Sequence, residues 1–66
     1  MNGDWVARLH QEFSELGMRL EKLDAFILSD KFDELPEIER KDLKEQRKHM
    51  KGYHDVLTRR ISRRCG

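Results

Sequence analysis

The chain has 66 residues, of which 41% are charged, yet the formal net charge is only +1. This balance differs from that of a strongly basic domain that binds duplex nucleic acid, and a single cysteine cannot form an internal disulfide. A chain this short forms one domain at most and buries only about 60% of its unfolded surface. Its core therefore needs help, and oligomerisation is the route left open.

No apolar run approaches the roughly 20 residues of a membrane span, and the acidic start lacks the basic segment of a signal peptide. We therefore expect a reduced protein of the cytoplasm. His49 and His54 stand five residues apart, whereas paired metal ligands on a helix stand four apart. With no Gly-rich phosphate loop and no plausible catalytic pair, we expect no metal, no cofactor and no enzymatic activity.

The first predicted helix runs from about Asp4 to Leu28 and carries apolar residues in alternating steps of three and four. Asp4 suits the first turn because an aspartate caps free amides and favours the positive end of the helix dipole. The period is close to 3.5 residues, which favours packing against another helix in a left-handed crossing. The members of this ladder are Val6, Leu9, Phe13, Leu16, Leu20, Leu23 and Ile27.

A connector over 29–35 separates this helix from a second one, predicted over 36–62. Pro36 marks the start because its missing N–H is harmless at the first helical position. Phe32 and Leu35 are too apolar for a free loop, so we expect them to cover the end of the core, on a short turn capped by Ser29. The inner face of the second helix comprises Ile38, Leu43, Met50, Tyr53, Leu57 and Ile61, with Val56 beside it.

These elements predict an all-α fold, an antiparallel two-helix hairpin that occupies the single domain 1–66. Two helices alone leave the ladder half exposed, and Phe26 and Met18 lie off the seam. We therefore expect hairpins to assemble as a homodimer or a higher even oligomer, in a homo-oligomeric helical bundle. The expected oligomer interface comprises Leu9, Phe13, Leu16, Leu20, Leu23, Ile27, Met50 and Leu57.

Three residues within the predicted helices are unusual for their positions. Gly17 and Gly52 lie inside helices, where glycine costs about 1 kcal/mol relative to alanine, and close backbone approach is the simplest reason for both. Gln46 falls where the second helix needs a ladder residue. It is either a buried polar residue that fixes register or a seam-edge residue that reaches water.

Charge is divided between the two halves of the chain. Through Pro36 there are four Lys or Arg against eight Asp or Glu, and from Glu37 onward there are ten against five. Like charges repeat four residues apart in the second helix, as in Arg47 and Lys51, and such repeats repel unless an anionic group lies across them. The basic face is therefore either solvated and paired with the first helix, or a surface for an anionic ligand.

The best candidate site is the basic end of the second helix, over 59–66. In an antiparallel hairpin this end meets the start of the first helix, which brings arginine donors beside an aromatic ring, a combination suited to phosphate and a stacked base. The alternative is a basic helix end stabilised by the dipole, with Trp5 as a core plug. The candidate ligand-binding residues are Trp5, Arg8, Tyr53, His54, Arg59, Arg60, Arg63 and Arg64.

The residue pattern resembles a group of small phage and prophage proteins. The most distinctive part is the connector, which reads Phe26-Ile27-x-Ser29-x-x-Phe32-x-x-Leu35-Pro36 and is followed by Gln46, Met50 and Tyr53. The resemblance covers nearly the whole chain, from Trp5 to Ile61. It implies that the protein acts by occupying a host protein or a host immune signal, and it transfers no catalytic residue.

Two functions of different classes follow from these observations. The first is a phage accessory binding protein that inhibits host antiviral defence by sequestering an anionic, cyclic nucleotide or by blocking a host defence protein. The second is a structural or regulatory adaptor that binds nucleic acid or a partner helix, in which the arginines only form a soluble helix end.

Overall fold

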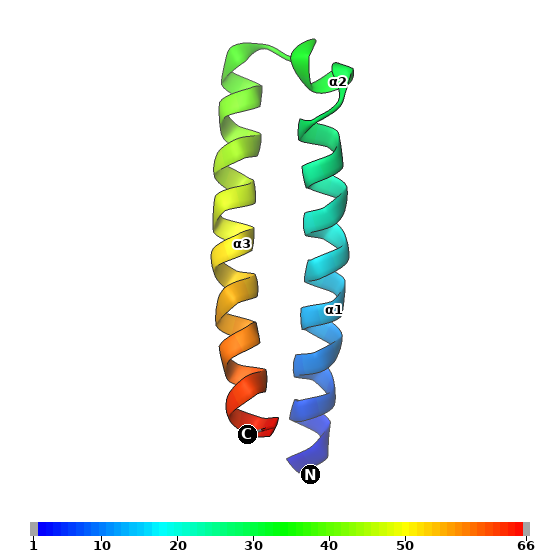
Figure 1. Cartoon of the computed structure of the whole chain (residues 1–66), viewed down its shortest axis with the longest axis vertical. Helices are drawn as coiled ribbons and strands as arrows, with labels where there is room; N and C mark the ends of the chain where they lie inside the picture. The colour runs from blue at the N-terminus through cyan, green and yellow to red at the C-terminus, as the bar shows by residue number, and fades with distance from the viewer. Residues whose placement is uncertain (1, 66) are drawn as a thin grey trace.

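The computed structural model of the chain is an antiparallel helical hairpin, about 48 Å long (Figure 1). Two long helices, α1 (Asn2–Ile27) and α3 (Glu37–Cys65), lie side by side, and the short helix α2 (Asp30–Asp33) lies in the connector. The structure describes the backbone of residues 2–65 and the side chains of residues 4–63. The predicted all-α class is confirmed, and no described helix is both long and apolar enough to cross a membrane.

The helix ends differ from the predicted ones by one to three residues. α1 begins at Asn2, before Asp4, and ends at Ile27. Pro36 lies just before α3, since its carbonyl accepts hydrogen bonds from the amides of Glu39 (3.0 Å) and Arg40 (3.1 Å) and so begins the helical ladder. α3 continues past Ser62 to Cys65, so the basic segment is helical to its last described residue.

The core of the hairpin is an apolar seam between α1 and α3. Leu9, Leu16 and Leu57 form a buried cluster, and Leu57 has no exposed surface at all. Phe13, Met50 and Ile61 are partly buried and pack against this cluster. The most apolar part of the ladder is therefore covered within one chain, where α3 meets α1. Leu9, Leu16 and Leu57, which were expected at an oligomer interface, contact each other inside the hairpin, and the oligomer interface itself stays a prediction.

The other residues expected at the oligomer interface are less deeply buried than the leucine cluster. Each of them is half-buried in the hairpin. Packing within one chain therefore covers part of every one of these side chains. The residues in this group, all expected at an oligomer interface, are Phe13, Leu20, Leu23, Ile27 and Met50.

The connector covers the end of the core as a one-turn helix. Phe32 is 4% exposed and meets the ring of Phe26 edge to face at 6.2 Å, so Phe26 is half-buried although its ladder position is off the seam. The expected Ser29 cap does not form. The Ser29 hydroxyl instead donates to the carbonyl of Phe26 at 2.6 Å, which satisfies a carbonyl at the end of α1 rather than an amide of α2.

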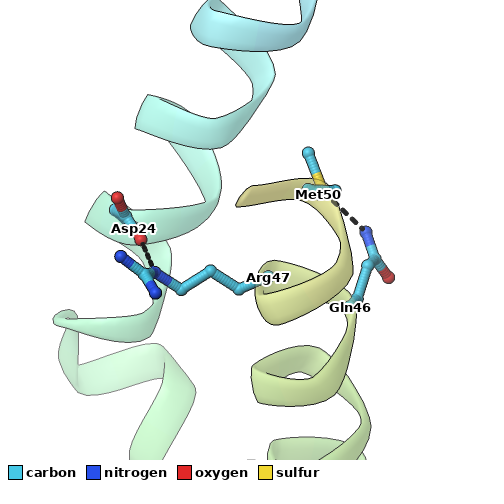
Figure 2. A network of polar contacts seen from close by, with 4 residues as sticks. All are labelled: Asp24, Gln46, Arg47 and Met50. Carbon is cyan, nitrogen blue, oxygen red and sulfur yellow. Dashed lines mark hydrogen bonds and ion pairs between the residues drawn. The ribbon is translucent and has the colours of Figure 1, made fainter. Parts of the chain in front are cut away.

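Among the side chains that the structure describes, one ion pair joins α1 and α3, in the half of the hairpin nearer the connector (Figure 2). The guanidinium of Arg47 donates to the carboxylate of Asp24, and both side chains are partly exposed, at 39% and 41%. Gln46, one residue before, points away from this pair and donates to the sulfur of Met50 at 3.8 Å. Gln46 is exposed. The hairpin therefore supports the interpretation that Gln46 lies at the edge of the seam and reaches water.

The two internal glycines are not explained by contact between α1 and α3. A Cβ on Gly17 meets the His54 Nε2 atom at 3.7 Å, which is ordinary van der Waals contact. A Cβ on Gly52 has nothing within 4 Å. No contact within the hairpin therefore requires glycine at either position, and close approach of a second subunit stays a prediction.

Two leucine truncations test the seam as the source of stability. Leu57→Ala is expected to lower the free energy of unfolding by about 2–5 kcal/mol, because it leaves a cavity in the buried cluster. Leu28→Ala makes the same chemical change at a side chain that is 86% exposed, so its effect stays within about 0.5 kcal/mol. Urea unfolding followed by circular dichroism measures both, and equal effects contradict this assignment of the core.

Gly17→Ala is expected to stabilise the hairpin by about 0.5–1 kcal/mol. Alanine has the higher helix propensity, and the added methyl group fits against His54 without displacing it. The same urea titration measures the change. A destabilised Gly17→Ala variant indicates that the helices need a closer approach at this point than the hairpin has.

Candidate functional site

Tyr53 and Glu12 connect the two long helices on one side of the hairpin. The Tyr53 hydroxyl on α3 donates to the Glu12 Oε1 atom on α1. The Tyr53 side chain is still 42% exposed, so one part of the ring faces solvent. This contact shows which side of α1 lies next to which side of α3.

Spacings of three, four and seven residues place four further residues on that side. Trp5 and Arg8 precede Glu12 by seven and four residues, so they share its face of α1. Val56 and Arg60 follow Tyr53 by three and seven residues and share its face of α3. Because the helices are antiparallel, both sets extend from the Tyr53–Glu12 contact toward the termini. We call this side the terminal surface; it comprises Trp5, Arg8, Glu12, Tyr53, Val56 and Arg60.

The terminal surface combines apolar rings with cations. Trp5 is 36% exposed and Val56 is 39% exposed, while both arginines are exposed. Arginine presents a planar fork of donors that matches phosphate oxygens, and indole and phenol rings offer faces on which a base stacks. The surface can therefore offer hydrogen bonds to an anion next to a place for a flat ring.

The pKa of the Tyr53 phenol depends on its two charged neighbours, Glu12 and Arg60. The hydrogen bond to Glu12 raises the pKa of the phenol, and partial desolvation and the Glu12 charge act in the same direction. The positive charge of Arg60 opposes them and lowers the pKa, which places Arg60 within electrostatic range of the ring. The net shift is upward because the neutral phenol is the form that donates to the carboxylate.

Two of the sequence candidates lie elsewhere on the hairpin. His54 stacks on Phe13, with ring centroids 4.5 Å apart, and lies near Gly17. Its ring therefore packs against α1 and is half-buried, away from Tyr53. Arg59 precedes Arg60 by one residue, a turn of about 100° around the helix, so its side chain leaves α3 on another side. Neither residue is therefore part of the terminal surface, and a ligand-binding role for them stays a prediction.

The other candidates lie at the helix end. Arg63 is exposed and follows Arg60 by three residues, on the next turn of α3. The side chains of Arg64 and Cys65 lie outside the described residues, so the fourth arginine of the candidate site is placed only by its backbone.

Several cations of α3 already have partners within the chain. Arg40 donates to the carbonyls of Leu35 and Asp33 and so holds the connector, and Arg47 pairs with Asp24. Lys44 lies over the Phe32 ring, 5.8 Å from its centroid. Lys51 lies 3.5 Å from Asp55. Much of the like-charge repetition along α3 is therefore balanced inside the hairpin.

Hollows on the surface lie away from the terminal surface. One is lined by Glu15, Met18, Arg19 and Lys22 on α1, and another by Glu37, Arg40, Lys41 and Lys44 at the start of α3. Both are open to solvent. In a single chain the terminal surface is thus an exposed side of the hairpin and lines neither hollow.

Glu12 and Val56 were not among the candidate ligand-binding residues. The spacing contained the signal for Glu12, since it stands seven residues after Trp5 and four after Arg8. The signal was missed because the register with α3, which brings Tyr53 against Glu12, depends on packing rather than on spacing. Among residues with described side chains, no group of three or more His, Cys, Asp or Glu is arranged to hold a metal ion.

The fold and the terminal surface define a class, an all-helical hairpin protein with an aromatic and arginine-bearing surface. The model of the Sequestin family matches residues 3–63, nearly the whole chain, and the chain belongs to this family. The family name is compatible with a binding function that sequesters another molecule. No curated protein and no solved structure matches the chain.

Titration of Tyr53 tests the geometry of the terminal surface. Tyr53 is the single tyrosine of the chain, so phenolate absorbance follows this residue alone. We expect its midpoint above the ordinary value of 10.0 in the native protein and a lower midpoint in Glu12→Gln, with Glu15→Gln as the control. Because the pKa is raised in the folded state, the stability from this contact is complete below pH 10 and is lost as the pH rises through the folded pKa. A midpoint that Glu12→Gln leaves unchanged contradicts the contact.

Proposed function

We propose that the protein is a non-enzymatic binding protein that sequesters an anionic nucleotide, cyclic nucleotides included. The observation that carries the proposal is the terminal surface, which places the exposed Arg8 and Arg60 on the same side of the hairpin as the partly exposed rings of Trp5 and Tyr53. Membership of the Sequestin family supports a sequestering role, and the nucleotide as its object is inferred from the side chains.

The proposed binding mode uses each residue type for one part of a nucleotide. Arg8 and Arg60 donate charge-assisted hydrogen bonds to phosphate oxygens. Trp5 and Tyr53 contact the base through their ring faces, an interaction worth about 1–3 kcal/mol per stacked base. Glu12 orients Tyr53 and excludes a phosphate from the immediate neighbourhood of its own carboxylate. No residue receives a catalytic role.

The resemblance to small phage and prophage proteins supports a biological setting for this binding. In that setting the protein acts in the cytoplasm of the host cell and inhibits antiviral defence by lowering the free concentration of a nucleotide signal. Direct blocking of a host defence protein is the alternative outcome of the same binding surface.

Self-association is part of the proposal. The buried apolar cluster of one chain is small, and Tyr53, Val56 and Ile38 are exposed at 42%, 39% and 70% on α3. A 66-residue chain with a core of this size gains stability by covering such residues. A homodimer, or a higher even oligomer, also supplies a second wall for a binding surface that is open in the single chain.

Nucleotide binding to arginine variants tests the proposal directly. Calorimetry with a panel of linear and cyclic mono- and dinucleotides is expected to find a ligand whose affinity falls about 10–100-fold in Arg60→Ala, because one charge-assisted hydrogen bond is lost. Trp5 is the single tryptophan of the chain, so its fluorescence provides a second signal of binding. Lys48→Ala removes the same charge from an exposed position twelve residues away and is expected to bind normally.

Binding that is absent across the panel, or weakened equally by Arg60→Ala and Lys48→Ala, contradicts a nucleotide site on the terminal surface. The alternative of a nucleic-acid adaptor predicts a different result. A salt-dependent shift of DNA or RNA in a gel, lost in Arg63→Ala/Arg64→Ala, supports that alternative.

A further inference from the structure

α3 carries a second row of regularly spaced residues on surface that the seam leaves open. Glu45, Gly52 and Arg59 stand seven residues apart in the sequence. A second line beside them has the same spacing and consists of Asp42, His49, Val56 and Arg63. Steps of seven residues keep side chains on one side of a helix, with a drift of about 20° per step. We call this set the outer row, and every member is exposed: Asp42, Glu45, His49, Gly52, Val56, Arg59 and Arg63.

The charges of the outer row are ordered around a glycine. The acidic members, Asp42 and Glu45, lie before Gly52, and the basic members, Arg59 and Arg63, lie after it. Glu45 and Arg59 are equally distant from Gly52 in sequence. Asp42 and Arg63 are also almost equally distant from it, at ten and eleven residues. The row therefore has opposite charges at matched distances from its centre.

This order has a specific meaning for a two-fold symmetric contact. In such a contact residue i of one copy meets residue j of the other, and j meets i. If two α3 helices cross antiparallel at Gly52, Glu45 of one copy lies opposite Arg59 of the other. Asp42 then lies opposite Arg63, and His49 opposite Val56. Each attractive pair occurs twice, so the row is complementary to its own copy.

Gly52 supplies an independent observation. Glycine lowers helix stability relative to alanine, and a Cβ at Gly52 has nothing within 4 Å in the hairpin. No contact within the chain therefore accounts for the missing side chain. At the crossing point of two helices, a residue without a Cβ allows the closest approach of the two backbones.

The charged side chains of the outer row also form few ion pairs within the described part of one chain. Glu45 lies 3.7 Å from His49, in a pair whose side chains are 64% and 74% exposed. Among the side chains that the structure describes, Arg59 and Arg63 form no ion pair. Their guanidinium groups remain available to carboxylates of a second copy.

We propose that the outer row is the surface through which two copies of this chain associate, with their α3 helices antiparallel and crossing at Gly52. The proposal builds on the self-association included in the proposed function and names its interface. It moves that interface from the ladder, which the hairpin covers, to the exposed side of α3. Val56, beside Tyr53 on α3, then brings the second copy to the edge of the terminal surface.

Charge reversal in the full chain tests the interface by sedimentation equilibrium at low salt. The wild type is expected to be a dimer, and Glu45→Arg and Arg59→Glu are each expected to raise the dimer Kd at least about tenfold, because each creates two like-charge contacts per dimer. The double variant Glu45→Arg/Arg59→Glu restores opposite charges and is expected to return to within about threefold of the wild-type Kd. Glu21→Arg, the same reversal on an exposed position of α1, is expected to leave the Kd unchanged.

A steric variant keeps the test independent of charge. Gly52→Leu adds a large side chain at the proposed crossing point and is expected to raise the dimer Kd at least about tenfold while retaining the helical circular dichroism signal. A monomeric wild type, a double variant that fails to recover, or a Gly52→Leu variant that dimerises normally each overturns the proposed interface.

Calorimetry with the nucleotide panel on the same samples separates this inference from the proposed function. Dimerisation that follows the charge-reversal pattern without any nucleotide binding overturns the ligand and leaves the interface. Nucleotide binding by a protein whose association ignores the outer row overturns the interface and leaves the ligand.

Discussion

The hairpin depends on the packing of Leu57 against Leu9 and Leu16. Leu57 is the one fully buried large side chain among those described, and the half-buried Phe13, Met50 and Ile61 pack against the cluster that it forms. This contact sets the distance and the register between α1 and α3. The Asp24–Arg47 pair and the Tyr53–Glu12 hydrogen bond follow from that register, since each joins side chains that the seam has already brought together.

The fold could be predicted from the sequence because its determining signals are local. The three-and-four spacing of leucines defines one face of α1, Pro36 limits the start of α3, and Phe32 is too apolar to leave in solvent. The predicted Ser29 cap failed because residue spacing does not show which of two nearby backbone groups a side chain will bond. Ser29 has both an amide and a carbonyl within reach, and its hydroxyl donates to the carbonyl of Phe26.

The candidate site could be predicted only in part, for a related reason. Sequence reasoning brought Trp5 and Arg8 to the basic end of α3, since an antiparallel hairpin leaves no other arrangement. It could not separate Arg60 from Arg59, or Tyr53 from His54, because neighbouring residues diverge by about 100° and the exact rotation of α3 decides which one faces α1. Packing of His54 on Phe13 settles that rotation and leaves Tyr53 for the terminal surface.

The position of the terminal surface along the hairpin has a mechanical consequence. The connector joins α1 and α3 covalently at one end, whereas the two termini lie together at the other end without a covalent link between the helices (Figure 1). Helix ends open more readily than helix centres, so this end is where the two helices first separate. A molecule that contacts Arg8 and Arg60 at once clamps the open end, and its binding energy adds to the stability of the whole hairpin. Binding of a ligand at this end therefore raises the free energy of unfolding of the whole hairpin.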